Sequence, residues 1–378
     1  MNQTDLLSPR LDMSRFSSPT QRIAGYDLAR SIALLGMIFV NFKYLMEAEE
    51  YGTPFQIWLS NLLDGRPAVT FVILAGAGLS LLNSASDRNG KSFFPAKASP
   101  AILKRAGFLF LIGLAFSRIW HADILHFYGI YFAVAVFLAN VPSRMLIALS
   151  IAAAIMTLIF AFHFEFVALP KADNVWTPEF WTQEGFLENL FFSGCYPVFP
   201  WIVYFLTGML LGRQNIADCR LQKRILLVAA LVVISAETCA WLMENVILTA
   251  SMLERFPLLF FVLGTDPFSA SILAVFSAGG TGLLVIVLSM TIAQKAGASK
   301  WLKPFLATSQ MSLTLYIAQI GICQLLLMLV GQADKEYPLT WAWFWATVFN
   351  VAALAFAYLW VNHFERGPFE KLLRWVSK

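Results

Sequence analysis

Apolar residues occur in long uninterrupted runs along this chain of 378 residues. Many of the runs approach the roughly 20 residues that a helix needs to cross the hydrocarbon core of a bilayer. A membrane β-barrel would instead require segments of about ten residues with alternating polarity. The pattern predicts an all-α, polytopic integral membrane helical bundle. Its ten predicted spans cover residues 28–46, 66–83, 101–119, 123–141, 145–165, 196–213, 223–247, 268–293, 307–331 and 340–362.

Composition and charge support this prediction and orient the bundle. Hydrophobic residues make up 58% of the chain and charged residues only 13%, whereas soluble domains carry about a quarter charged residues. The tail, the alternate loops on the same side and the C-terminal segment hold 20 of the 27 Lys and Arg residues. Because short loops rich in Lys and Arg stay in the cytoplasm, both termini are predicted to be cytoplasmic.

Three regions follow from the same pattern. Residues 1–26 are rich in Ser, Pro and Thr and are predicted to form a disordered cytoplasmic tail. Residues 27–363 form the predicted transmembrane domain. Residues 364–378 are predicted to contain a cytoplasmic amphipathic C-terminal helix, whose apolar face lies on the membrane while its basic residues meet anionic head groups.

Three polar side chains interrupt the first predicted span and share one face of its helix. At about 100° per residue, Arg30 and Asn41 lie within roughly 20° of each other, and Asp27 lies within about 40° of that line. A charged group inside a span is costly unless it faces protein or water, so this face is predicted to point into the bundle. Asp27 and Arg30 are spaced to pair one turn apart. The alternative is an acid near a helix N-terminus and a snorkelling arginine.

Further polar residues lie at the outer ends of later spans. Arg66 enters the second span at the level of Asn41, and the hairpin between the third and fourth spans holds His121, Asp123 and Tyr128. A carboxylate beside a histidine orients the ring and stabilises its charged form, which is the basis of general-base catalysis. Asp123 would equally serve as the N-cap of the fourth span, so both interpretations stay open.

The remaining candidates are on the sixth and ninth spans. Arg213 ends the sixth span on the predicted cytoplasmic side. Tyr316 and Gln319 lie near one face of the ninth span, where each polar group either contacts a substrate or bonds its own backbone. The four cysteines form no CxxC pair, and no metal site is predicted.

Four segments, in order, resemble the YeiB-like family of bacterial membrane proteins. The opening motif of that family is similar to "GYDLARSIALLGMIFVNF", residues 25–42. A related opening recurs in heparan-α-glucosaminide N-acetyltransferase and, more faintly, in other integral-membrane acyltransferases. Later signatures of these proteins resemble "YPVFPWIVYFLTGMLLGR", "MSLTLYIAQ" and "FERGPFEKLLR". The resemblance extends from residue 22 to about residue 375.

The resemblance implies a multi-pass acyltransferase of the bacterial cytoplasmic (inner) membrane, with residues 27–363 as the acyltransferase-like domain. It implies transfer of an acetyl or acyl group from cytoplasmic acetyl-CoA, or another acyl-CoA, to an extracytoplasmic sugar or similar hydroxyl or amine acceptor. Asn41 matches the catalytic-site asparagine of the acetyltransferase. The binding residues expected on this basis are Asp27, Arg30 and Arg213 for the donor and Arg66, Tyr128, Tyr316 and Gln319 for the substrate.

The sequence departs from the family at two places. Ser31 stands where the opening motif has glycine, and the first outer loop lacks the catalytic histidine of the acetyltransferase. Either His121 with Asp123 supplies the base from the neighbouring hairpin, or a carboxylate is the base, or this chain has left acyl transfer.

Two other functions remain open at this point. A transporter of a small solute or lipid would use the polar stripe as a path, and a non-catalytic membrane protein would use it only to pack helices. The expected partners are membrane lipids and a small-molecule acceptor such as a saccharide, with a homodimer as an open alternative and no nucleic acid.

Overall fold

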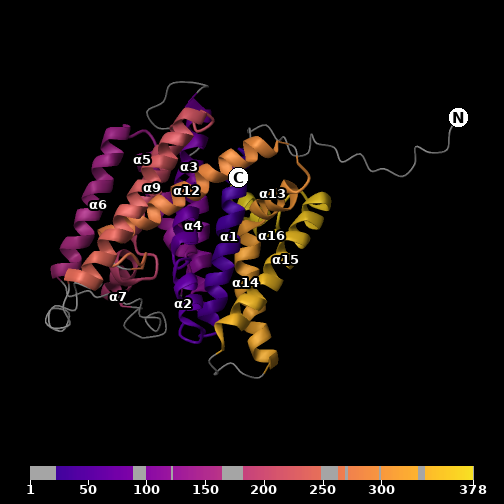
Figure 1. Cartoon of the computed structure of the whole chain (residues 1–378). Helices are drawn as coiled ribbons and strands as arrows, with labels where there is room; N and C mark the ends of the chain where they lie inside the picture. The colour runs from indigo at the N-terminus through magenta and orange to yellow at the C-terminus, as the bar shows by residue number, and fades with distance from the viewer. Residues whose placement is uncertain are drawn as a thin grey trace, which may run out of the picture.

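The computed structural model describes residues 23–87, 99–120, 122–163, 182–247, 263–268, 271–297, 299–330 and 337–377, and every regular element in these ranges is a helix (Figure 1). The predicted tail therefore lies almost entirely outside the described residues. The helices are α1 (Ala24–Leu45), α2 (Pro54–Asn61), α3 (Arg66–Asp87), α4 (Ser99–Phe116), α5 (Leu125–Leu138), α6 (Ser143–His163), α7 (Gln183–Glu188), η4 (Asn189–Ser193), α8 (Val198–Gly212), α9 (Cys219–Leu242), η5 (Met243–Ile247), α12 (Ile272–Ala296), α13 (Leu302–Gln310), α14 (Ser312–Val330), α15 (Leu339–His363) and α16 (Pro368–Val376).

Each predicted span coincides with a helix, in the order α1, α3, α4, α5, α6, α8, α9, α12, α14 and α15. Within the described residues, 6 segments are long and apolar enough to cross a membrane, or 7 if the bent pair Glu184–Ser193 and Val198–Gly212 is one span. The helices Leu125–Leu138 and Ser143–Ile159 are apolar but shorter. The protein is therefore an all-α polytopic bundle, while the count of ten spans and the cytoplasmic termini stay predictions.

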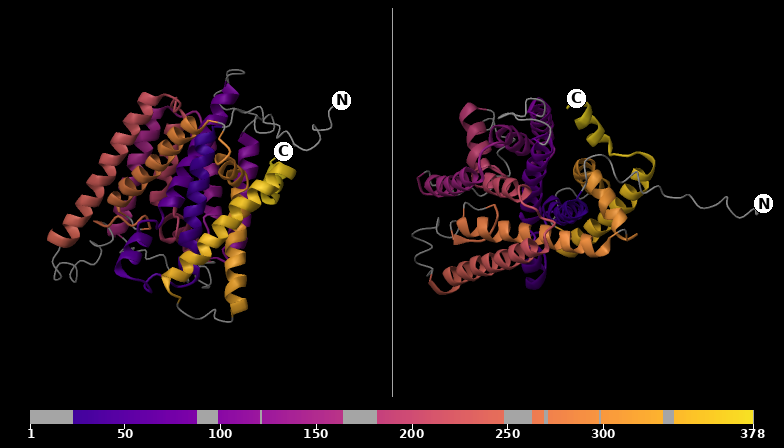
Figure 2. Two further views of the ribbon diagram at one scale, coloured as in Figure 1. Left: turned by 45° about the vertical axis from the view of Figure 1, so that its right-hand side comes forward. Right: turned by 90° about the horizontal axis from the view of Figure 1, so that it is seen from above.

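α1 is the central helix of the bundle (Figure 2). It packs against α3, α12, α13, α14 and α15. Leu34, Ile38 and Phe42 are almost fully buried. Because they are spaced four residues apart, they form one apolar stripe along the helix. Of the polar residues of the first predicted span, Asn41 is 4% exposed, whereas the charged pair Asp27 and Arg30 stays partly accessible.

α3 and α8 pack at backbone distance. A Cβ atom at Gly76 would lie 2.1 Å from the carbonyl oxygen of Phe205, and one at Gly208 would lie 2.0 Å from that of Ile73. Small residues let helix backbones approach closely, and in membranes such close packing drives helix association because the hydrophobic effect does not. The glycines of these two helices therefore fix the position of α3 against α8.

A buried ion pair joins α1 to the turn before α3. The Nζ atom of Lys43 lies 2.7 Å and 2.6 Å from the two carboxylate oxygens of Asp64. The Lys43 side chain is 1% exposed and that of Asp64 is 13% exposed. A charge this deeply buried needs its partner, because the desolvation of a lone ion costs several kcal/mol.

The C-terminal helix α16 is bonded to the bundle through Glu370. Its carboxylate accepts hydrogen bonds from the backbone N–H groups of Leu313 and Thr314, at 2.7 Å and 3.1 Å, and from the Thr314 hydroxyl at 2.5 Å. These N–H groups belong to the first turn of α14, which has no intrahelical partner for them. Glu370 therefore caps α14 and places α16 beside it.

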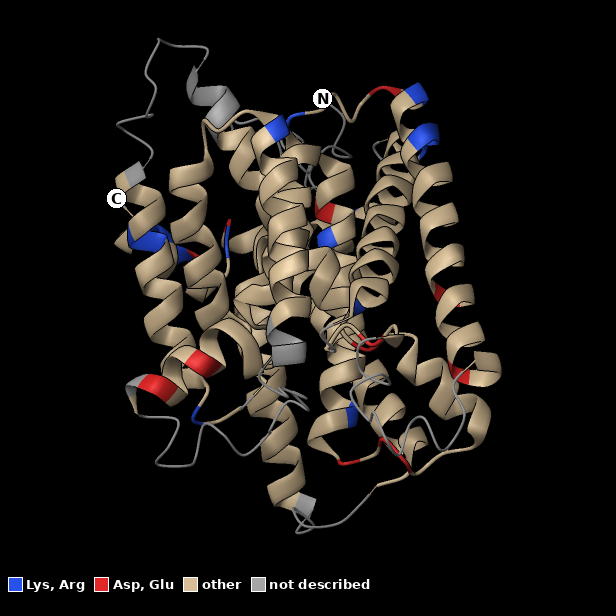
Figure 3. Cartoon of the chain, turned by 90° about the vertical axis from the view of Figure 1, so that its left-hand side faces the viewer, with Lys and Arg blue, Asp and Glu red and all other residues tan. Residues whose placement is uncertain are grey.

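Basic and acidic residues are distributed unequally over the bundle. In Figure 3, Lys and Arg lie mainly in the upper half and Asp and Glu mainly in the lower half. The end that holds Arg105, Arg224 and Arg374 is called the basic end below.

Gly76→Ala is expected to lower the free energy of unfolding by about 1–3 kcal/mol, because the added methyl group overlaps the α8 backbone. Gly78→Ala is the matched control on the same helix, since nothing lies within 4 Å of a Cβ atom there and alanine is the better helix former. Thermal unfolding in detergent should show a lower Tm for Gly76→Ala alone. Equal midpoints for the two variants would contradict the close contact.

Asp64→Asn is expected to cost about 3–5 kcal/mol of stability, because Lys43 then keeps a buried charge without a counter-charge. The double variant Lys43→Met with Asp64→Leu removes both charges and should unfold at a higher temperature than Asp64→Asn. The measurement is again the Tm in detergent. If Asp64→Asn unfolds like the unaltered protein, the pair does not stabilise the bundle.

Candidate functional site

A cavity of about 480 Å³ lies between α1, α3, α4, α5, α14 and α16. Most of its wall is apolar. The larger apolar residues in the wall include Leu34, Met37, Phe71, Leu74, Leu109 and Phe132. Charged residues line it at the basic end, and tyrosines line it further in. The cavity therefore suits a ligand with an anionic part and an apolar part.

Asp27 and Arg30 line the cavity at the N-terminal end of α1. The pair predicted from their spacing is present, with Arg30 Nη1 3.3 Å from Asp27 Oδ1. The Ser309 hydroxyl donates to the same carboxylate oxygen at 2.9 Å and accepts from Arg30 at 3.3 Å. Ser309 belongs to α13, so the three side chains join α1 to α13. The Arg30 side chain remains 30% exposed, which leaves part of its guanidinium accessible.

Three more arginines, Arg105, Arg366 and Arg374, line the same cavity. Arg105 of α4 and Arg374 of α16 lie close enough for their positive charges to repel each other. Neither forms an ion pair with an acidic residue in the described part of the chain. Arg105 Nε instead donates to the Ser377 hydroxyl at 3.3 Å. Clustered positive charge in a cleft with apolar walls attracts anions.

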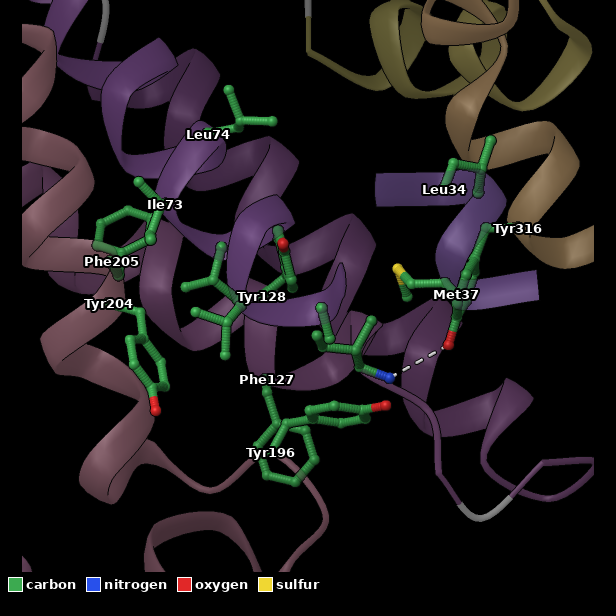
Figure 4. Packing of buried hydrophobic residues seen from close by; sticks show 14 of the residues in the cluster. Leu34, Met37, Ile73, Leu74, Phe127, Tyr128, Tyr196, Tyr204, Phe205 and Tyr316 are labelled. Carbon is green, nitrogen blue, oxygen red and sulfur yellow. Dashed lines mark hydrogen bonds between the residues drawn. The ribbon is translucent and has the colours of Figure 1, made fainter. Parts of the chain in front are cut away.

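Tyr128 and Tyr316 line the inner part of the cavity. Figure 4 shows Tyr316 beside Met37, and its hydroxyl accepts a hydrogen bond from the backbone N–H of Ile124 at 3.3 Å. The same hydroxyl lies 3.3 Å from Asp123 Oδ1 and donates to it. The Tyr128 hydroxyl is buried and has no hydrogen-bond partner among the described residues. Tyr316 is thus held in place by hydrogen bonds, whereas the Tyr128 hydroxyl can still donate one to a ligand.

Asp123 is fully buried and forms a pair with His126. Its Oδ2 atom lies 3.1 Å from His126 Nδ1 and accepts from the backbone N–H groups of Leu125 and His126 at 2.9 Å and 3.3 Å. Asp123 therefore caps the first turn of α5 and also contacts a histidine ring. The role of Asp123 at the start of α5 is therefore observed, while its role beside a catalytic histidine stays a prediction. The histidine is His126, whereas His121 lies outside the described residues.

Arg66 is held by groups far away in the sequence. Its Nη2 atom lies 2.7 Å from Glu237 Oε1 and 3.3 Å from the Ser277 hydroxyl, which also donates to Glu237. The carbonyl oxygens of residues 61 and 62 accept from its Nη1 atom at 3.4 Å and 3.1 Å. Arg66 does not line the cavity. It joins the start of α3 to α9 and α12.

Two acidic residues near Lys43 are partly desolvated. Burial raises the pKa of Asp266 above its ordinary value, although Arg66 and Lys43 act in the opposite direction. Burial likewise raises the pKa of Glu49, against the effect of Lys43. Carboxyl groups thus lie close to Lys43 from several parts of the chain.

Two buried amides carry groups without partners among the described residues. Asn41 is 4% exposed, and its Nδ2 atom has no hydrogen-bond partner. Gln319 is fully buried, and both polar atoms of its side chain lack one. Buried polar groups are normally satisfied, so each of these needs an explanation such as a water or a ligand. Neither residue lines the cavity.

Arg213 also lies away from the cavity lining. Its Nη1 atom donates to the carbonyl oxygen of Val141 at 2.6 Å, and its Nη2 atom donates to that of Ala139 at 3.3 Å. The guanidinium therefore supplies hydrogen bonds to backbone carbonyl groups just beyond the C-terminal end of α5. Of the predicted site residues, the cavity brings together Asp27, Arg30, Tyr128 and Tyr316, with Asp123 attached through Tyr316.

Sequence reasoning missed His126 as the partner of Asp123, and it missed Arg105 and Arg374. The His126 signal was present, because a carboxylate that caps a helix often meets the side chain three residues on. The arginines gave no local signal, since they come from opposite ends of the chain. Among the described residues, no three His, Cys, Asp or Glu side chains are placed to share a metal ion.

Two protein families match the chain. Residues 22–240 match the family described as "Heparan-alpha-glucosaminide N-acetyltransferase, catalytic", and residues 211–378 match "Protein of unknown function (DUF418)". A comparison with curated proteins finds no match. The resemblance stated from the sequence motifs is thereby confirmed. Because the first match covers more than half of the chain, the protein belongs to the family of the heparan-alpha-glucosaminide N-acetyltransferase catalytic domain.

Proposed function

We propose that the protein is an integral-membrane acyltransferase that moves an acetyl or other acyl group from cytoplasmic acyl-CoA to an extracytoplasmic hydroxyl or amine acceptor, such as a saccharide. The observation that carries this proposal is the cavity. It has arginines at the basic end and a tyrosine further in that contacts a buried Asp–His pair. The family match supports acyl transfer in general, and the donor, the acceptor and the bacterial inner membrane are part of the proposal.

The residues of the cavity fit an acyl-CoA. Arg30, Arg105 and Arg374 offer guanidinium groups, whose planar donors match phosphate oxygens. The apolar wall beyond them suits the long arm that joins the phosphates to the thioester. From Arg30 to Met37 the cavity follows α1 for roughly 10 Å. Bound there, the donor supplies a thioester carbonyl that an acceptor can attack.

His126 is the proposed general base. Asp123 accepts from Nδ1 of the ring, which leaves Nε2 to take the proton of the acceptor hydroxyl or amine. A new bond forms between the acceptor oxygen or nitrogen and the acyl carbon, while the bond from that carbon to sulfur breaks and the thiol leaves. His121, from the same hairpin, stays the alternative base.

Hydrogen bonds to the reacting groups are proposed to come mainly from side chains that have no hydrogen-bond partner among the described residues. The Tyr128 hydroxyl lines the cavity without a hydrogen-bond partner among the described residues, and it would donate to the thioester oxygen. Asn41 and Gln319 are proposed to bind the acceptor with their unpartnered amides. Tyr316 is proposed to contact the acceptor at the cavity wall, while Arg66, which does not line the cavity, holds α3 against α9 and α12. Arg213, which is bonded to carbonyl groups away from the cavity, would act on the donor only through its positive charge.

Removal of the proposed base should act on turnover rather than on binding. His126→Gln is expected to lower kcat by about 10²–10⁴-fold with the donor Kd unchanged. The measurement is thiol release from acetyl-CoA by proteoliposomes supplied with amino sugars and neutral sugars. His121→Gln, in the same hairpin, is the comparison. If His121→Gln abolishes turnover and His126→Gln does not, the base is His121.

Donor binding should depend on the arginines of the cavity. Arg105→Gln and Arg374→Gln are each expected to weaken acetyl-CoA binding about tenfold, since a hydrogen bond to a charged group contributes about 1.5–3 kcal/mol. Arg144→Gln is the control, because Arg144 is exposed and does not line the cavity. Isothermal titration of the purified protein in detergent measures all three. No binding of acetyl-CoA by the unaltered protein would contradict the proposed donor.

A further inference from the structure

A second cavity, of about 440 Å³, lies between α8, α9 and α12. It shares no lining residue with the first cavity. In the right-hand view of Figure 2, α9 and α12 lie side by side at the periphery of the bundle. In an apolar 18-residue window of the candidate span Cys219–Ile247, which includes α9, only 17% of the residues are buried. The second cavity therefore lies where a membrane protein meets lipid.

The wall of this second cavity is mostly apolar, and its hydroxyl groups need no hydrogen bond from a ligand. Its two hydroxyl groups are already used, since Thr207 donates to the carbonyl oxygen of Val203 at 2.8 Å and Tyr204 to that of Ala274 at 3.4 Å. Gly279 leaves room on the α12 side, because a Cβ atom there would first meet the Tyr204 ring at 3.5 Å. An occupant of this space must therefore be apolar along most of its length.

One charged residue, Arg224, lines the second cavity, and it lies toward the N-terminal end of α9. It is exposed and forms no ion pair with any acidic residue in the described ranges. Arg220 and Lys223 precede it at the basic end of the helix. A guanidinium binds phosphate oxygens with two parallel donors. The second cavity thus combines an apolar slot with a single cationic end.

The length of the slot matches one leaflet of a bilayer. Along α9 the lining residues run from Leu221 to Val232, which is roughly 16 Å at 1.5 Å per residue. Half of a hydrocarbon core is about 15 Å. From the level of Arg224 to Val232 the slot runs for roughly 12 Å, so an acyl chain that begins at Arg224 would follow it over most of one leaflet.

We propose that this second cavity binds one anionic diacyl phospholipid from the leaflet at the basic end of the bundle. One acyl chain lies in the slot between α8, α9 and α12, and the phosphate contacts Arg224. Phe276, which lines the slot, is exposed, so the slot is open to lipid on this side and the second chain stays in the bilayer. This binding is independent of acyl transfer, because no residue of the first cavity takes part.

The charge of Arg224 should decide the preference for anionic lipid. Native mass spectrometry of the purified full chain, titrated with phosphatidylglycerol or phosphatidylcholine, measures the Kd of the first bound lipid. Arg224→Gln is expected to weaken phosphatidylglycerol binding about five-fold, which corresponds to ~1 kcal/mol. Lys223→Gln removes the same charge one residue away, outside the slot, and should leave the Kd unchanged. Equal effects of the two variants would mean diffuse attraction to a basic surface and would overturn the proposal.

A bulky residue in the slot should remove the site. Gly279→Phe is expected to weaken phosphatidylglycerol binding at least tenfold, while Gly321→Phe, at an exposed glycine with nothing within 4 Å, should not. Val228→Trp fills the slot from α9 and replaces Gly279→Phe if that variant does not fold. Unchanged binding in a folded slot-filling variant would overturn the proposal. So would displacement of the lipid by inorganic phosphate alone, since the ligand would then be a soluble anion.

Discussion

Charged side chains inside an apolar bundle must be paired or face water, because a lone buried ion costs several kcal/mol. The protein meets this constraint with ion pairs that join separate helices. Lys43 and Asp64 connect α1 to the turn before α3, and Arg66 and Glu237 connect α3 to α9. In these pairs each charge is neutralised by its partner, and the pair holds two parts of the bundle together. Arg105 and Arg374, which line the first cavity, form no ion pair with an acidic residue in the described part of the chain, so positive charge remains where an anionic ligand would enter.

Two glycines of α3 serve the contact with α8 and the first cavity separately. Gly76 contacts the α8 backbone, whereas Gly78, two residues later, has open space around it and lines the cavity. Two residues turn a helix by about 200°, so the two glycines lie on opposite faces. The same lack of side chains therefore makes one interface dense and leaves the other hollow.

The sequence predicted those features of the fold and site that depend on local signals. The apolar runs located the helices because length and hydrophobicity are properties of a segment, and the Asp27–Arg30 pair followed from one helical turn. Glu237 had no predicted partner, since Arg66 is 171 positions away. Arg105 and Arg374 meet because α16 packs against α4 and is bonded to α14 through Glu370. The pairing of Asp123 with His126 was within reach of the three-residue spacing at the predicted start of the fourth span, but the predicted pair was Asp123 with His121 instead.

Asp123 explains how a family member without a histidine in the first outer loop keeps a candidate base. Its carboxylate bonds two backbone N–H groups of α5, the His126 ring and the Tyr316 hydroxyl. A carboxylate held by the backbone cannot rotate away from the ring, so the orientation of His126 is set when the helix forms. Tyr316 lines the first cavity and extends this network to its wall. In the proposed mechanism the base is thus moved from a loop to a helix start, where the fold itself positions it.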